Sequence, residues 1–216
     1  MNDELDLRPA AELRFDTFGL AESVGLWCVA PAAPPAGGEA SPNAHLAAAT
    51  AASFDALGDI VVPWGVDVLP EPDTDVDPLR LERAADDAPA AFVARVRQVI
   101  ETFPAAVRAV EADVDVIAYV RTADSPDRPV RARARLGDVL YTFGGEKPAV
   151  CLSVQHTLFA PYSPYGLDNA ELHALNQPLL EAALRRWEER VGPIIEFEGY
   201  PGIFRYGFRT PTESSP

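Results

Sequence analysis

The chain has 216 residues, 33 acidic and 18 basic side chains, a formal net charge of −15, and 48% hydrophobic residues. A chain of this length can bury a substantial core, in one large domain or in two small ones. The acidic balance disfavours nucleic acid and anionic membranes as partners and would attract a basic protein.

The compartment is inferred from the first residues and from the cysteines. Residues 1–6 are acidic where a secretory signal peptide is basic and then apolar, and no window approaches a membrane-spanning length. Cys28 and Cys151 lie in apolar segments and are interpreted as buried free thiols. We therefore expect a cytoplasmic protein. The Ala, Arg and Pro content, with Lys147 as the only lysine, suggests a bacterial source.

The first 70 residues predict a strand–helix–strand unit. Ser41-Pro42 matches a helix N-cap followed by proline at the first helical position, and Gly58 is the expected helix end. The expected elements are strands near 13–18 and 24–30, a loop at 32–40, a helix at 42–57, and a strand at 60–68 interrupted by Pro63.

An acidic, proline-bearing connector follows at 70–78. It suggests two subdomains, 1–70 and 79–216, which we expect to form one compact unit. The later elements are expected as a helix through 92–110 bent at Pro104, strands at 114–121, 130–136, 139–143 and 149–159, a helix at 168–191, and a hairpin at 195–209.

The chain is organised around the strand at 149–159. Its even positions are apolar and its odd positions are small or polar, which places His156 on the apolar face. Asp168 and Glu171 have the N-cap and N3 spacing of a helix start. Leu175 belongs to the apolar stripe expected along this helix, and Pro178 is expected to kink or break the helix near this residue.

The closing hairpin is predicted from alternation on both sides of a turn at 199–202. Together these elements predict an α+β fold, a mainly antiparallel sheet with two to three helices packed on one face. A short echo between Asn43-Ala44-His45-Leu46 and Asn169-Ala170-Glu171-Leu172 raises the alternative of two related strand–helix–strand halves.

No catalytic signature is present. Ser23 lacks the first glycine and the following helix of a nucleophile elbow, and no glycine-rich phosphate loop occurs. The calcium-like run at 73–77 fails at Pro78 and Ala84, and no histidine has a metal-ligand neighbour at zinc-site spacing. We assign no catalytic residue, metal site or cofactor.

Two groups of polar residues are candidate binding residues. His156 is either a satisfied core histidine or a proton-handling residue that lines a pocket. Arg131, Arg133 and Arg135 alternate on one strand face, where they can bind carboxylates or pair across the strand. In the paired arrangement Arg135 opposes Asp115 and Arg131 opposes Tyr119. Arg133 then faces Ile117 and is the arginine left free for a ligand.

Tyrosines on turns are typical of recognition surfaces, although packing against the core is the alternative. Tyr162, Tyr165 and Tyr200 lie in such loops.

The leading hypothesis is a protein-interaction module with an immunity- or antitoxin-type role, which binds a partner through its acidic surface and aromatic loops. The alternative is a small-molecule-binding protein or enzyme with a pocket near His156. Nucleic-acid binding through the arginines is disfavoured by the net charge. The sequence indicates no oligomeric state.

Overall fold

The computed structural model describes residues 20–32, 41–162 and 168–210. The expected strand at 13–18, most of the loop at 32–40, and Tyr165 lie outside these ranges. The elements in chain order are β1 (Leu20–Val29), α1 (Pro42–Leu57), β2 (Val61–Pro70), β3 (Leu79–Glu82), α2 (Pro89–Thr102), β4 (Val107–Thr122), β5 (Ser125–Ala134), β6 (Val139–Phe143), β7 (Ala149–His156), α3 (Ala170–Arg190), β8 (Ile194–Gly199), β9 (Ile203–Phe204) and β10 (Gly207–Phe208).

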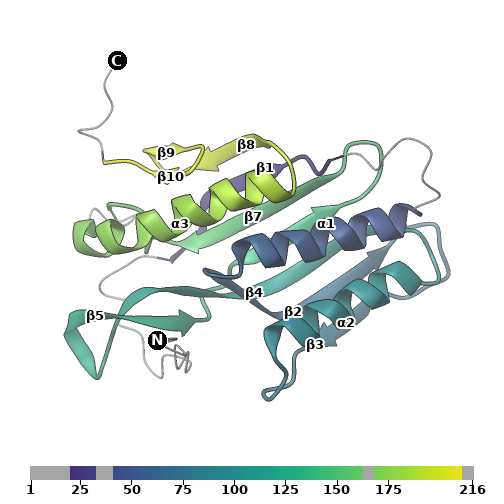
Figure 1. Cartoon of the computed structure of the whole chain (residues 1–216), viewed down its shortest axis with the longest axis horizontal. Helices are drawn as coiled ribbons and strands as arrows, with labels where there is room; N and C mark the ends of the chain where they lie inside the picture. Colours follow the sequence, from purple (N-terminus) through teal and green to yellow (C-terminus); the bar gives the residue numbers. More distant parts are fainter. Residues whose placement is uncertain (1–19, 33–40, 163–167, 211–216) are drawn as a thin grey trace.

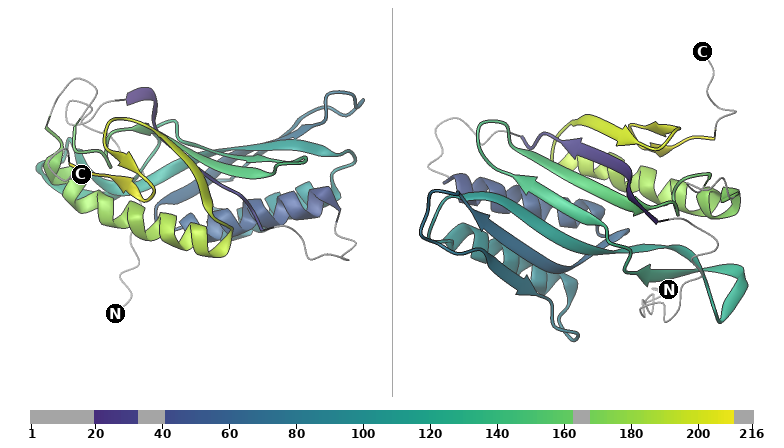
Figure 2. Two further views of the ribbon diagram at one scale, coloured as in Figure 1. Left: turned by 90° about the horizontal axis from the view of Figure 1, so that it is seen from above. Right: turned by 180° about the vertical axis from the view of Figure 1, so that it is seen from behind.

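The architecture confirms the predicted α+β class. Eight strands form one antiparallel sheet in the order β3-β2-β4-β6-β7-β1-β8, with β5 also paired to β4, and three helices accompany it. All three helices lie on one face of the sheet, and the view from behind shows strands in front of helices (Figures 1 and 2). β8 and β3 end this strand order, and β5 is paired on one side only, to β4.

β4 is the longest strand and shares one of its edges between β5 and β6. β6 pairs with its first half, from Ala109 to Asp113, and β5 pairs with its second half, from Val116 onward. Strands from both sides of the acidic connector at 70–78 therefore belong to one sheet. No helix in the described ranges is long and apolar enough to cross a membrane.

The predicted start and end of α1 are confirmed. The Ser41 hydroxyl accepts the Ala44 N–H at 3.2 Å, Pro42 occupies the first turn, and Gly58 is the C-cap. Because a proline at this position lacks only an N–H that the helix would leave unpaired, it does not weaken the helix. The helix buries one face that includes Leu46, Phe54 and Leu57.

The single long helix expected through 92–110 is wrong. α2 ends at Thr102, and Val107 and Val110 belong to β4. Phe103, the residue before Pro104, has φ −59° and ψ 135°, because proline pushes its predecessor out of the helical region. The apolar spacing alone did not distinguish a helix that ends here from one that bends, and β3 was not predicted.

α3 differs from its prediction at its start, and it has no break at Pro178. Its N-cap is Asn169 and not Asp168, although the Asp168 carboxylate accepts the Ala170 N–H at 2.9 Å. The helix continues through Pro178 to Arg190 without a break. Although Pro178 removes one N–H donor, buried side chains before and after it pack the helix against the sheet. Leu175, expected on the buried stripe, is exposed.

The expected closing hairpin is also wrong. β8 pairs with β1, and β9 pairs with β10. The small β9–β10 hairpin covers Trp27, whose indole N–H donates to the Phe204 carbonyl at 3.0 Å and whose ring meets Phe208 edge-on at 5.5 Å. Burial of Trp27 thus determines where the C-terminal segment packs.

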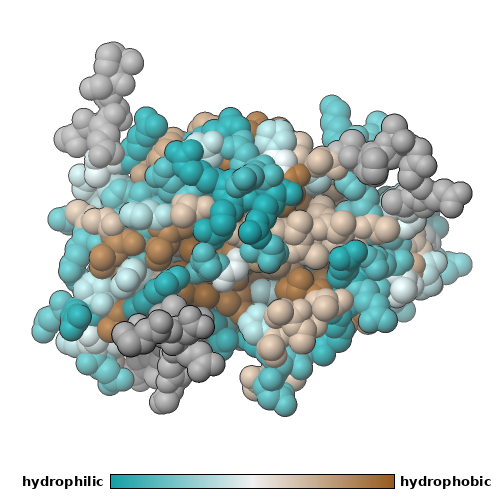
Figure 3. Space-filling model, in the orientation of Figure 1, coloured by the Kyte–Doolittle hydropathy of each residue, from teal (hydrophilic) through white to brown (hydrophobic). Residues whose placement is uncertain are grey.

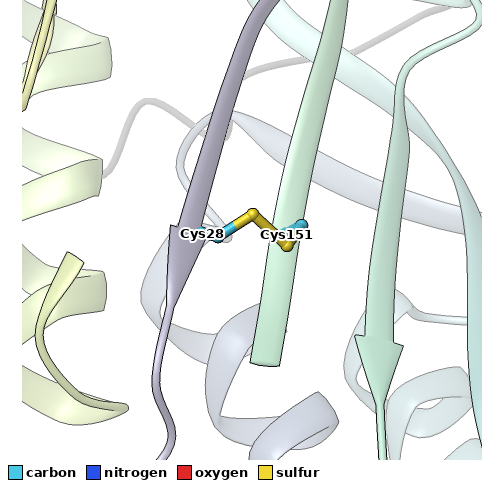
Figure 4. Close-up of a disulfide and its surroundings, with 2 residues drawn as sticks. All are labelled: Cys28 and Cys151. Carbon is cyan, nitrogen blue, oxygen red and sulfur yellow. A yellow bond between two sulfur atoms is a disulfide. The ribbon is translucent and has the colours of Figure 1, made fainter. Parts of the chain in front are cut away.

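The two cysteines are joined, which corrects the expectation of free thiols. Cys28 in β1 and Cys151 in β7 are directly opposite and form a disulfide with Cα atoms 4.1 Å apart (Figure 4). Directly opposite residues come this close at the non-hydrogen-bonded positions of an antiparallel pair. The pairing could not be read from two cysteines separated by 123 positions.

Candidate functional site

The arginines of β5 have the register that the sequence predicts. Arg131 is opposite Tyr119, and Arg133 is opposite Ile117. Arg131 donates to the Asp59 carbonyl at 3.1 Å, and with Asp59 and Arg186 it lines a cavity of about 350 Å³. Arg131 is therefore tied to the loop after α1.

Arg133 is not the free arginine that was expected. Its Nε lies 3.3 Å from Asp115 Oδ2, and Arg135 donates to the other carboxylate oxygen at 2.9 Å. Ile117, the residue opposite Arg133, is two residues along β4 from Asp115, so Arg133 reaches the carboxylate diagonally, and Arg135 directly follows the last residue of β5. Arg135 also stacks on Trp64 at 3.9 Å. Arg83, whose backbone N–H donates to the Trp64 carbonyl, lies near this cluster. Burial of its guanidinium lowers the pKa of Arg83, and the positive charge of Arg133 lowers it further.

His156 is fully buried on the apolar face of β7, as the alternation predicts. Its Nδ1 accepts the Leu158 N–H at 3.2 Å, which leaves Nε2 to carry the proton. That nitrogen lies 3.2 Å from Asp138 Oδ2, a contact at ion-pair distance without hydrogen-bond alignment. The other oxygen of Asp138 accepts the Gln155 N–H at 2.7 Å. The imidazole thus has partners inside the core.

The tyrosines are divided between surface and core. Tyr162 is exposed and bridges to Asp168, whereas Tyr200 is half-buried against the core. Tyr165 is outside the described residues. In four of the cavities lined by described residues, Arg131 is the one residue present out of the described candidates His156, Tyr162, Tyr200, Arg131 and Arg133. His156 lines none of the four.

Sequence reasoning missed the edge strand β8, because it assigned that strand to a hairpin. Every residue of β8 after Ile194 is exposed, including Ile195 at 60% and Phe197 at 42%. Two exposed carboxylates, Glu196 and Glu198, alternate with them. In the described part of the chain neither carboxylate has an ion-pair partner.

The register of β8 shows which backbone groups face outward. Tyr200 N–H donates to the Val24 carbonyl at 2.9 Å, and Glu198 is opposite Leu26. Bonded and non-bonded pairs alternate in an antiparallel ladder, so Glu198 and Glu196 are at the bonded positions toward β1. The N–H and C=O of Phe197 therefore point away from the sheet, and no hydrogen bond joins them to another residue in the described part of the chain.

The opposite edge of the sheet is guarded. β3 has only four residues, and its Arg80 binds Asp67 at 2.5 Å and Asp113 at 2.6 Å. Short edge strands with charged side chains resist pairing with another chain. β8, with six residues and exposed apolar side chains, is the more open of the two edges.

The helix-covered face is mixed in character. Hydrophilic side chains cover most of it, and apolar ones appear between them (Figure 3). In the described part of the chain no group of three or more His, Cys, Asp or Glu side chains could hold a metal ion.

Comparison with known proteins adds no family: no family model, no curated protein and no solved structure matches this chain.

Proposed function

We propose that this chain binds a protein partner by adding an extended segment of that partner to β8. The observation that carries this proposal is the free, exposed edge of β8 with its outward-facing Phe197 backbone. Strand addition uses main-chain hydrogen bonds for affinity and alternate side chains for specificity. Six residues offer an edge of roughly 20 Å.

The side chains of β8 define the chemistry of the segment. Glu196 and Glu198 lie on one face of the sheet, and Phe197 on the other. A matching strand alternates Lys or Arg with apolar residues, because opposite charges across neighbouring strands are favourable. The net charge of −15 steers a basic partner toward the chain.

A second copy of this chain fits the edge poorly. A two-fold axis perpendicular to the sheet, passing through Phe197, would place Glu196 of one copy opposite Glu198 of the other. Like charges directly opposite each other destabilise a strand pair. The edge chemistry therefore favours a different, basic chain.

An inhibitor of a basic toxin, of the immunity or antitoxin type, would use such a surface, and we propose this role for a bacterial protein. The Cys28–Cys151 disulfide argues against the cytoplasmic location expected from the sequence, because disulfides rarely persist in a reducing cytosol.

The test uses the full chain and a labelled peptide of alternating Lys and Val, with binding followed by fluorescence anisotropy. Glu198→Lys should weaken binding roughly fivefold to tenfold. Glu189→Lys is the matched control, because Glu189 is an exposed α3 carboxylate without an ion pair in the described part of the chain. Phe197→Pro removes an outward N–H and should abolish binding while circular dichroism stays unchanged.

Equal weakening by Glu198→Lys and Glu189→Lys would reduce the effect to net charge and contradict an edge site. Retained binding by Phe197→Pro would contradict strand addition. A dimer in sedimentation that Phe197→Pro dissociates would identify a second copy as the occupant.

A further inference from the structure

A cavity of about 680 Å³ lies at one end of the sheet, and none of the described candidate residues His156, Tyr162, Tyr200, Arg131 and Arg133 lines it. It is formed where β1 ends, α1 and β4 begin, and β6 turns into β7. Its volume is in the range of pockets that bind small organic ligands. Its lining is Ala30, Pro31, Pro42, His45, Leu46, Val107, Gly144, Gly145, Glu146, Lys147, Pro148 and Ile195.

The wall of this cavity is mainly apolar, with one buried polar atom. Leu46 and Val107 are buried core residues that also face the cavity. His45 Nε2 is buried and has no hydrogen-bond partner among the described residues. A buried imidazole nitrogen without a partner costs free energy that a ligand group could recover. The position of His45 is fixed, because its backbone N–H donates to the Ser41 carbonyl at 3.1 Å in the first turn of α1.

Two charged side chains complete the lining. Lys147 is the only lysine in the chain, and neither it nor Glu146 forms an ion pair with any described residue. Both are exposed on the β6–β7 turn, so they line the cavity from its open side. An unpaired ammonium beside a buried imidazole is suited to a carboxylate, while the neighbouring Glu146 repels anions of higher charge such as phosphates.

We propose that this cavity binds an amphipathic monocarboxylate. The apolar body of the ligand lies against Leu46, Val107 and Ile195. Its carboxylate accepts hydrogen bonds from the Lys147 ammonium and the His45 imidazole. This site is independent of strand addition at β8, although Ile195 belongs to that strand.

The test is calorimetric titration of the full chain with decanoate below its micelle concentration, beside decanol and decylammonium as uncharged and cationic probes of equal chain length. We expect one saturable site for decanoate and binding at least threefold weaker for each of the other two probes. Tighter or equal binding of decanol or decylammonium, or no saturable decanoate binding, would overturn the proposal.

Variants locate the site. Lys147→Gln should weaken decanoate binding roughly threefold to tenfold, as loss of a partly exposed ion pair predicts. His45→Phe keeps the ring size and removes the nitrogen, and it should weaken decanoate more than decanol. Arg128→Gln is the matched control, because Arg128 is an exposed cation outside the cavity lining.

An equal effect of Lys147→Gln and Arg128→Gln would contradict a site at this cavity. Glu198→Lys, which tests the β8 edge, should leave decanoate binding unchanged, so the two proposals can fail separately.

Discussion

Asn176 on α3 holds both backbone groups of Tyr119 on β4. Its side-chain oxygen accepts the Tyr119 N–H at 2.7 Å, and its amide nitrogen donates to the Tyr119 carbonyl at 2.9 Å. Tyr119 lies beyond the last residue of β4 that β2 pairs with, so the side-chain amide replaces a neighbouring strand there. A second bond from the same amide reaches the Leu158 carbonyl at 3.1 Å. One asparagine thus fixes α3 to the centre of the sheet.

Asn176→Leu should lower the free energy of unfolding by about 2–4 kcal/mol, because it leaves the Tyr119 backbone groups buried without partners. Urea unfolding followed by fluorescence of the buried Trp27 and Trp187 measures the change. Gln98→Leu on the exposed face of α2 is the control and should stay within about 0.5 kcal/mol. A loss below about 1 kcal/mol for Asn176→Leu would show that this amide does not anchor the helix.

The Cys28–Cys151 disulfide closes a long loop, because the two residues are 123 positions apart in the sequence. The disulfide restricts the unfolded chain over this loop, so it should raise the free energy of unfolding by about 2–5 kcal/mol. Urea unfolding with and without a reducing agent should differ by this amount, and Cys151→Ser should show no such difference. Alkylation of unreduced, denatured protein at both cysteines would contradict the pairing.

Glu188 anchors the C-terminal segment. It pairs with Arg205, accepts the Tyr206 hydroxyl at 2.6 Å, and accepts the Ile194 N–H at 3.1 Å. The hydrogen bond from Arg205 is the main cause that lowers the Glu188 pKa from 4.5 to about 2.

A depressed carboxyl pKa contributes stability above pH 4.5 that is lost as the pH falls toward about 2. Glu188→Gln should therefore be less stable at pH 7 and should lose less on acidification to pH 3 than the parent chain. Paired urea titrations at the two pH values measure this. An identical pH dependence in parent and variant would remove Glu188 as its source.

His156 and Asp138 form a buried pair whose partners we expect to depend on each other. Asp138→Asn retains an oxygen for the Gln155 N–H and removes the charge that faces the imidazole. A double-mutant cycle of Asp138→Asn and His156→Gln should give a coupling energy of roughly 1–3 kcal/mol. Additive single effects would indicate that the contact at 3.2 Å contributes nothing to stability.

Periodicity in the sequence determined the elements whose signals are local. Three such features were predicted correctly: the N-cap at Ser41-Pro42, the buried face of β7 that includes His156, and the position of Arg131 opposite Tyr119. Each depends on neighbouring residues or on one turn. Apolar spacing alone failed at Pro104, because the run of apolar residues continues from the end of α2 into β4.

Tertiary packing decided the features that join distant segments. β8 lies at an edge because it pairs with β1 on one side, while the residues that follow it form the β9–β10 hairpin over Trp27 and do not pair with its other side. Asp115 forms an ion pair with Arg133, the arginine expected to be free, and the register of β1 and β7 brings the two cysteines together. The cavity beside His45 and Lys147 lies where the end of β1, the starts of α1 and β4, and the β6–β7 turn come together. Local sequence determines which residues alternate or repeat, whereas contacts between segments far apart depend on which apolar surfaces cover one another in the whole fold.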